Sequence, residues 1–86
     1  MEEKHAQFMQ AALHEAQQAA TIGEIPIGCV IVKDDQIIGR GFNYREHSNL
    51  ATDHAEIRAI QMANQALQSW RLEECTLYVK IGRAQV

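Results

Sequence analysis

The sequence predicts an α/β domain in which a central sheet is sandwiched between helices. Two long segments, residues 3–20 and those from Asp53 onward, carry apolar residues at helical spacing. Three shorter segments are rich in β-branched residues, which favour strands. The expected order is helix, strand, strand, helix, strand. With 86 residues, the chain is long enough for at most one small domain.

The first predicted helix covers residues 3–20. Alanine, glutamine and glutamate, which have good helix propensity, dominate this segment. Its apolar face comprises Phe8, Met9, Ala12, Leu13, Ala16 and Ala20. Gly23 follows soon after, and a glycine readily adopts the left-handed conformation that ends many helices. The helix is therefore expected to end just before Gly23.

The next two segments predict a hairpin of two antiparallel strands. Residues 25–32 are almost continuously apolar, which indicates a strand covered on both faces. Pro26 stands near its start, where a strand tolerates a missing N–H donor. Residues 33–36 contain two aspartates and predict the hairpin turn, and residues 37–43 predict the returning strand. A polar loop over residues 44–52 follows.

The second predicted helix begins at Asp53, a residue type that suits the N-cap position. Its core-facing residues are expected to be Ile57, Ile60, Ala63, Leu67 and Trp70. Residues 76–79 predict the last strand. Because a helix separates the second and third strands, these two strands are predicted to be parallel.

Composition narrows the possible functional classes. The formal net charge is −3, from 8 basic and 11 acidic side chains that are interspersed, so a broad basic surface for nucleic acid is disfavoured. No apolar run approaches a membrane span, and the N-terminus lacks the layout of a signal peptide. Cys29 and Cys75 are too few for a disulfide framework. We therefore expect a reduced protein of the cytoplasm.

His54 and Glu56 are the residues most informative about chemistry. An imidazole at the start of a helix can bind zinc, and a nearby carboxylate can move protons for an attacking water. Helix capping explains the same residues: Asp53 and Glu56 have the spacing of a capping box, which leaves His54 as an ordinary residue of the first turn. On these residues alone, the capping interpretation is the better supported.

Two further residues could contact a substrate. Asn43 ends the second strand, and its side-chain amide offers both a donor and an acceptor to a base edge; an asparagine that starts a turn is the common alternative. Ile27 could line an apolar slot, with core packing as its alternative. Cys29 and Cys75 are metal-binding residue types, but neither lies at a helix N-terminus that would lower a thiol pKa. We expect them to be small buried apolar residues.

A set of segments, taken together, resembles the bacterial tRNA-specific adenosine deaminases. The resemblance runs from about residue 6 to residue 79, with order and spacing kept. The segments are residues 23–28, 32–35, 43–46, 54–57 and 69–79. Such a set is much more specific than a histidine two residues before a glutamate. It therefore favours a zinc site at His54, and Asp53 can still cap the helix.

The resemblance implies a cytidine-deaminase-like fold and a zinc-dependent hydrolysis of adenosine to inosine at the wobble position of a tRNA anticodon. By position, His54 resembles the zinc ligand and Glu56 the proton shuttle. Asn43 resembles the residue that holds the flipped base, and Ile27 one that packs on the face of the base. The resemblance also implies a homodimer that binds the anticodon loop near the boundary between its subunits.

The sequence departs from this family after Val79. The family continues with a Pro-Cys-x-x-Cys segment that supplies two thiolate ligands, whereas here residues 80–86 follow. We expect residues 1–79 to be the N-terminal portion of a deaminase domain and residues 80–86 to be a tail outside the family. Since a catalytic zinc normally has three protein ligands, this chain alone is expected to bind zinc weakly or not at all, with impaired activity.

Two alternatives remain open from the sequence. The chain could belong to a deaminase of the same superfamily that acts on a free base or nucleotide, such as guanine or cytosine; the match over residues 26–28 and 43–46 favours the tRNA enzyme. It could also be a non-catalytic module for packing or dimerisation, which the missing cysteines favour. In either case the third strand is predicted to have an unpaired apolar edge that promotes oligomerisation or aggregation.

Overall fold

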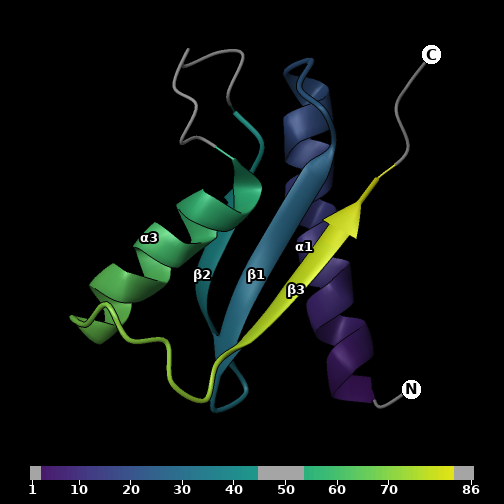
Figure 1. The fold of residues 1–86 in the computed structure, drawn as a ribbon. Coiled ribbons are helices and arrows are strands. Elements are labelled where there is room, and N and C mark those ends of the chain that lie inside the picture. The colour runs from purple at the N-terminus through teal and green to yellow at the C-terminus, as the bar shows by residue number, and fades with distance from the viewer. Residues whose placement is uncertain (1–2, 45–53, 83–86) are drawn as a thin grey trace.

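The computed structural model describes residues 3–44 and 54–82. The elements are α1 (Glu3–Thr21), β1 (Ile27–Lys33), β2 (Gln36–Phe42), α3 (Ala55–Leu67) and β3 (Thr76–Ile81). Figure 1 shows α1 and α3 on opposite faces of the sheet, which confirms the predicted helix–sheet–helix sandwich. Neither of these two helices is both long and apolar enough to cross a membrane.

The sheet has three strands in the order β2-β1-β3, and β1 is antiparallel to both of its neighbours. β2 and β3 therefore run in the same direction, as predicted for the second and third strands. They do not pair with each other, because the chain crosses over β1 through α3 before it forms β3. The last strand was predicted to end at Val79, but the structure continues it to Ile81.

Two turns, at Gly23 and at Asp34 and Asp35, have backbone conformations that suit their sequences. Gly23 has a φ of 79°, and the N–H of Glu24 donates to the carbonyl of Ala19 at 3.0 Å, which ends α1. In the hairpin between β1 and β2, Asp34 and Asp35 have φ values of 52° and 61°. Positive φ at both central residues is typical of a type I′ turn, whose twist matches that of the strands.

On one face of the sheet, α1 approaches β1 closely through small residues. Ala12, Ala16 and Ala19 are fully buried on α1. A Cβ at Gly28 of β1 would lie 2.2 Å from the backbone N of Ala16, so only a glycine allows this approach. The larger apolar side chains of this layer lie around the contact: Phe8, Val30, Val32 and Tyr78.

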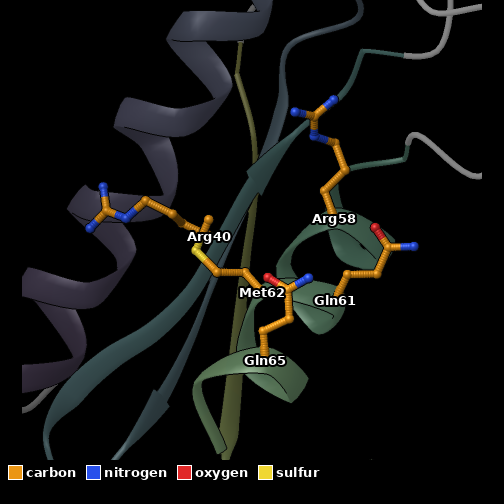
Figure 2. A pocket seen from close by; sticks show the side chains of 5 residues that line it. All are labelled: Arg40, Arg58, Gln61, Met62 and Gln65. Carbon is orange, nitrogen blue, oxygen red and sulfur yellow. The ribbon is translucent and has the colours of Figure 1, made fainter. Parts of the chain in front are cut away.

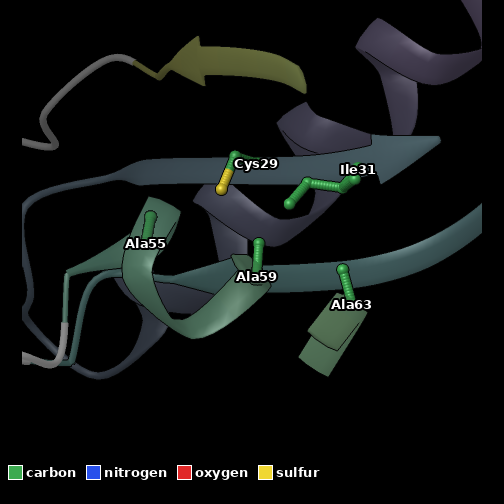
Figure 3. Packing of buried hydrophobic residues seen from close by; sticks show 5 residues of the cluster. All are labelled: Cys29, Ile31, Ala55, Ala59 and Ala63. Carbon is green, nitrogen blue, oxygen red and sulfur yellow. The ribbon is translucent and has the colours of Figure 1, made fainter. Parts of the chain in front are cut away.

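On the other face, α3 packs on β1 and β2 through a stripe of alanines. Ala55, Ala59 and Ala63 point toward Cys29 and Ile31 of β1, as Figure 3 shows. The larger residues that were predicted to face the core are only half-buried beside this stripe: Ile57, Ile60 and Leu67. Small residues occupy the centre because the helix and the strands lie too close together for larger ones.

Trp70 was predicted to be a core residue at the end of the second helix, and this prediction is wrong. Its side chain is 80% exposed. α3 ends at Leu67 because Gln68 adopts a left-handed conformation, with its N–H directed to the carbonyls of Asn64 and Gln65. The chain then leaves the helical path, so Trp70 no longer follows the helical period. The guanidinium of Arg71 lies 5.3 Å from the centre of its indole ring.

Candidate functional site

One end of the sheet brings together the start of β1, the end of β2 and the start of α3 (Figure 1). Ile27 is the first residue of β1, and Asn43 directly follows β2. The N–H of Asn43 donates to the carbonyl of Ile27 at 3.0 Å. Directly opposite residues of an antiparallel pair point to the same face, and Ile27 packs against the α3 layer. Both side chains therefore lie on the α3 side of the sheet.

Asn43 is buried, with 4% of its surface exposed. Its side-chain Oδ1 has no hydrogen-bond partner within the described part of the chain. A buried amide oxygen without a partner is costly, and such atoms are rare in folded proteins. This arrangement suits a group that receives a hydrogen bond from a ligand, and it goes beyond the turn-starting role that the sequence left open.

His54 is the N-cap residue of α3, with a φ of −81° and a ψ of 155°. Its carbonyl accepts a hydrogen bond from the N–H of Arg58 at 3.0 Å. Its half-buried side chain makes no capping hydrogen bond. The predicted cap Asp53 lies outside the described residues, and the helix begins one residue later than a capping box would require. Glu56 is therefore at the second helical position rather than the third.

The start of α3 is held close to the sheet by Gly41. A Cβ at this position of β2 would lie 2.5 Å from the carbonyl oxygen of Ala55, so a side chain there would push the helix start away. Ala55 is buried against the layer that contains Ile27. As a result, His54 and Glu56 lie at the end of the sheet that carries Ile27 and Asn43. The structure thus brings all four predicted site residues to one end of the molecule.

The electrostatics of Cys29 support this placement of Glu56. The pKa of the Cys29 thiol is raised to about 12, mainly because the thiol is buried and in addition because the carboxylates of Glu56 and Glu15 repel a thiolate. Cys29 is fully buried and stays protonated at neutral pH. Cys75 is half-buried, with its Sγ 3.5 Å from the carbonyl oxygen of Glu73. The prediction that both cysteines are buried is confirmed for Cys29, whereas Cys75 is only half-buried.

The number of metal-binding side chains determines whether these residues can hold a metal ion. His54 can supply one imidazole, but the described residues contain no group of three or more side chains that could bind a metal ion. A catalytic zinc normally has three protein ligands. The described residues therefore do not by themselves form a site with three protein ligands.

Arg58 is a residue of the site region that the sequence interpretation missed. Its guanidinium lies 5.5 Å from the ring centre of Phe42 and 5.1 Å from that of Tyr44, the two residues that flank Asn43. Two signals could have indicated it. Arg58 stands four residues after His54, which places both on one side of a helix, and aromatic residues on either side of Asn43 offer faces for a cation.

A polar groove of about 390 Å³ lies beside this region, between β2 and α3. It is lined by Arg40, Arg58, Gln61, Met62 and Gln65. Figure 2 shows that these side chains extend in different directions and do not converge on one point. The carboxylate of Glu15, a buried charge near the groove, is paired within the fold, because Arg40 Nη1 donates to Glu15 Oε2 at 3.0 Å. The groove does not contain the predicted site residues.

Residues 2–82 match the family model described as the cytidine and deoxycytidylate deaminase zinc-binding region. The chain belongs to the cytidine and deoxycytidylate deaminase family. It is 56% identical over 79 residues to the tRNA-specific adenosine deaminase of Streptococcus pyogenes, covering 92% of this chain and 50% of that protein. It is 45% identical over 74 residues to the enzyme of the same name from Bacillus subtilis, covering 86% and 46%. This deaminase-family chain thus spans about half the length of the curated relatives it matches.

Solved structures confirm the predicted cytidine-deaminase-like fold. One comes from a study of A-to-I editing by tRNA deaminases at the wobble position of transfer RNA. It matches with a TM-score of 0.83 and 44% identity, over 87% of this chain and 58% of that chain. The guanine deaminase of Bacillus subtilis matches with a TM-score of 0.80 and 38% identity, over 92% and 50%.

Proposed function

We propose that this chain carries the base-binding and proton-transfer residues of a zinc-dependent deaminase that converts adenosine to inosine at the tRNA wobble position. The buried, unpartnered Oδ1 of Asn43 carries this proposal, because it lies where α3 also presents His54 and Glu56. The identity of 56% to a tRNA-specific adenosine deaminase supports the same substrate class. An anticodon loop as substrate and a homodimer are part of the proposal, and a tRNA substrate agrees with a cytoplasmic location.

Asn43 and Ile27 would bind the base. A side-chain amide can donate one hydrogen bond and accept another, as the edge of adenine requires. Binding a base edge would relieve the cost of a buried oxygen without a partner. Ile27 stands beside Asn43 on the same face of the sheet and would offer an apolar surface to the flat face of the base.

His54 and Glu56 would carry the chemistry of deamination. His54 would be one protein ligand of the zinc, with the others supplied from outside the described residues. When bound, zinc supplies Lewis-acid activation of the attacking water. Glu56 would take a proton from that water and deliver one to the departing amine, so that adenosine plus water gives inosine plus ammonia.

A second candidate substrate is guanine, since the structural match to a guanine deaminase has 38% identity and a TM-score of 0.80. Both substrates can be tested in one assay of the zinc-supplemented protein. Inosine would be measured by mass spectrometry after incubation with an anticodon stem-loop that carries adenosine at the wobble position. Xanthine would be measured after incubation with guanine.

We expect the unaltered chain to form inosine slowly and to form no xanthine. We expect the Glu56→Gln variant to form no inosine. Glu56→Gln keeps the size of the side chain and removes only its ability to accept a proton, so it separates chemistry from folding. Xanthine without inosine would favour the guanine deaminase. Stem-loop binding that is weakened by Asn43→Ala, with neither product formed, would favour a non-catalytic binding module.

A further inference from the structure

Arg58 connects the two segments that supply the candidate site. Its backbone N–H donates to the carbonyl of His54 at 3.0 Å. Its guanidinium lies 5.5 Å from the ring centre of Phe42 and 5.1 Å from that of Tyr44, the residues on either side of Asn43. One residue is therefore hydrogen-bonded to the candidate zinc ligand and packed on both neighbours of the candidate base-binding amide.

The side chain of Arg58 passes around the outer edge of β2. A Cβ at Gly41 would lie 2.8 Å from the Cβ of Arg58, so a glycine is needed where the side chain leaves α3. Phe42 stands opposite Gly28, whose Cβ position lies among backbone atoms of α1, so Phe42 points to the α1 face of the sheet. β2 is an outer strand of the described sheet. Arg58 therefore reaches Phe42 past this edge, and Figure 2 shows its side chain directed away from the other groove residues.

The two rings and the guanidinium form one cluster, the Arg58 cluster. The ring centres of Phe42 and Tyr44 lie 6.2 Å apart with their planes at 88°, which is an edge-to-face arrangement. A guanidinium within about 6 Å of a ring centre is attracted to the ring, and more strongly where water is partly excluded. All three side chains are half-buried. The cluster therefore fixes the chain on both sides of Asn43.

Asn43 needs such support because it lies just beyond the last residue of β2. Its backbone N–H is bonded to the carbonyl of Ile27 at 3.0 Å, but its side-chain Oδ1 has no hydrogen-bond partner among the described residues. No hydrogen bond to Oδ1 from this part of the chain therefore orients the amide. Its direction depends on how firmly residues 42–44 are held.

We infer that Arg58 is a positioning residue, which fixes the Asn43 amide relative to the start of α3, where His54 and Glu56 lie. The inference rests on the proposed function, because a base is what Asn43 would hold there. It adds a residue that acts through Asn43 rather than on the base itself. A displacement of about 1 Å in a reactive geometry can cost about 100-fold in rate, so a contact that joins the two segments matters for the reaction.

Amide hydrogen exchange, followed by NMR on the 86-residue chain, measures this positioning without any ligand. In Arg58→Met, which keeps an unbranched stem and removes the charge, exchange of the Asn43 N–H should become at least ~5-fold faster relative to that of Ile31 in the central strand. The matched control is Arg71→Met. It removes a guanidinium that lies 5.3 Å from the ring centre of Trp70, beyond the other end of α3, and should leave both rates within ~2-fold.

The second readout is the preference of the chain for an adenosine at the wobble position. Fluorescence anisotropy would give dissociation constants for two anticodon stem-loops, one with adenosine there and one with an abasic residue. The ratio of the two constants reports contacts made to the base. Arg58→Met should reduce this ratio as much as Asn43→Ala does, and the two substitutions together should reduce it no further. A purely structural role of Arg58 would not give this non-additive result.

Two results would overturn the inference. One is an equal change of exchange at Asn43 and Ile31 in Arg58→Met, or no change at either, because Arg58 would then affect only global stability or nothing. The other is an equal weakening of both stem-loops in Arg58→Met, because Arg58 would then contact the RNA backbone itself. If Arg58→Met does not fold, Phe42→Leu takes its place, since it removes a ring of the Arg58 cluster and keeps an apolar side chain.

Failure of the proposed function gives a different result. If the unaltered chain binds both stem-loops equally, base binding by Asn43 is excluded. The exchange rates still decide whether Arg58 holds Asn43 in place: a selective increase at Asn43 in Arg58→Met supports the inference, and its absence overturns it.

Discussion

At the scale of single residues, Asn43 and Glu15 show how differently the fold treats two buried polar side chains. Glu15 is 6% exposed and receives a hydrogen bond from Arg40 at 3.0 Å. Asn43 is 4% exposed, and its Oδ1 has no partner in the described part of the chain. A polar group retained for stability is normally satisfied by the fold. The contrast supports the proposal that the Asn43 amide binds a ligand.

We expect Asn43→Leu to leave the free energy of unfolding unchanged or to raise it by up to about 1 kcal/mol. Leucine has nearly the same shape and removes the cost of the unpaired amide oxygen. The matched substitution Glu15→Leu should lower the free energy of unfolding by about 1 kcal/mol, because it breaks a bond to a half-exposed guanidinium. Urea denaturation measures both. A loss above ~2 kcal/mol in Asn43→Leu would mean that this amide stabilises the fold and would remove the main support for base binding.

The sequence predicts which residues could form the candidate site, but it does not predict their environment. Asn43 and Ile27 are far apart in sequence, and they meet through a hydrogen bond that exists only once β1 and β2 pair. The burial of Asn43 is likewise a property of the packed helix above it. For His54, the expected helix start was one residue too early, because an aspartate and a histidine in sequence do not determine which of them takes the extended N-cap conformation.

At the scale of elements, glycines and alanines decide how closely α3 lies on the sheet. Gly39 and Gly41 of β2 face the helix, and a Cβ at either position would come within 2.5 Å of its backbone oxygens. The helix meets them with Ala55, Ala59 and Ala63, all of which are buried. This close contact determines how far the start of α3 lies from the sheet, and therefore how far His54 lies from it.

Gly41→Ala should lower the melting temperature by about 10 °C or more. The added methyl group would lie 2.5 Å from the carbonyl oxygen of Ala55, which a flexible side chain cannot relieve. Overpacking of this kind costs about 1–3 kcal/mol, and each kcal/mol lowers the melting temperature of a small domain by about 4–8 °C. The control is Gly82→Ala, whose nearest contact of 3.5 Å is ordinary van der Waals distance. If the two variants melted at the same temperature, the close approach of α3 to β2 would be contradicted.

The element boundaries show why some sequence predictions failed. The order of elements followed from periodicity, and the left-handed cap at Gly23 followed from its residue type. Gln68 also adopts a left-handed conformation, with a φ of 52°, but glutamine is not a residue that signals such a turn. A helical period that is continued through Gln68 predicts that Trp70 faces the core, but its side chain is exposed.

At the scale of the whole molecule, the sheet order places the outer strand β3 next to the candidate site. β3 pairs with the side of β1 that β2 leaves free. Ile81 of β3 stands opposite Ile27, the residue whose carbonyl accepts a hydrogen bond from Asn43. This chain spans about half the length of its curated relatives. A zinc site at this end of the sheet would therefore need ligands beyond the described residues.

Zinc content tests this connection directly. The purified 86-residue chain, dialysed after zinc loading, should retain well under one zinc per chain, because its described residues contain no group of three metal-binding side chains. His54→Ala should reduce that content, whereas His14→Ala should not, since His14 lies on the exposed face of α1. Metal analysis by mass spectrometry gives the ratio. One tightly held zinc in the isolated chain would show that it completes the site by itself, and an unchanged zinc content in His54→Ala would exclude His54 as a ligand.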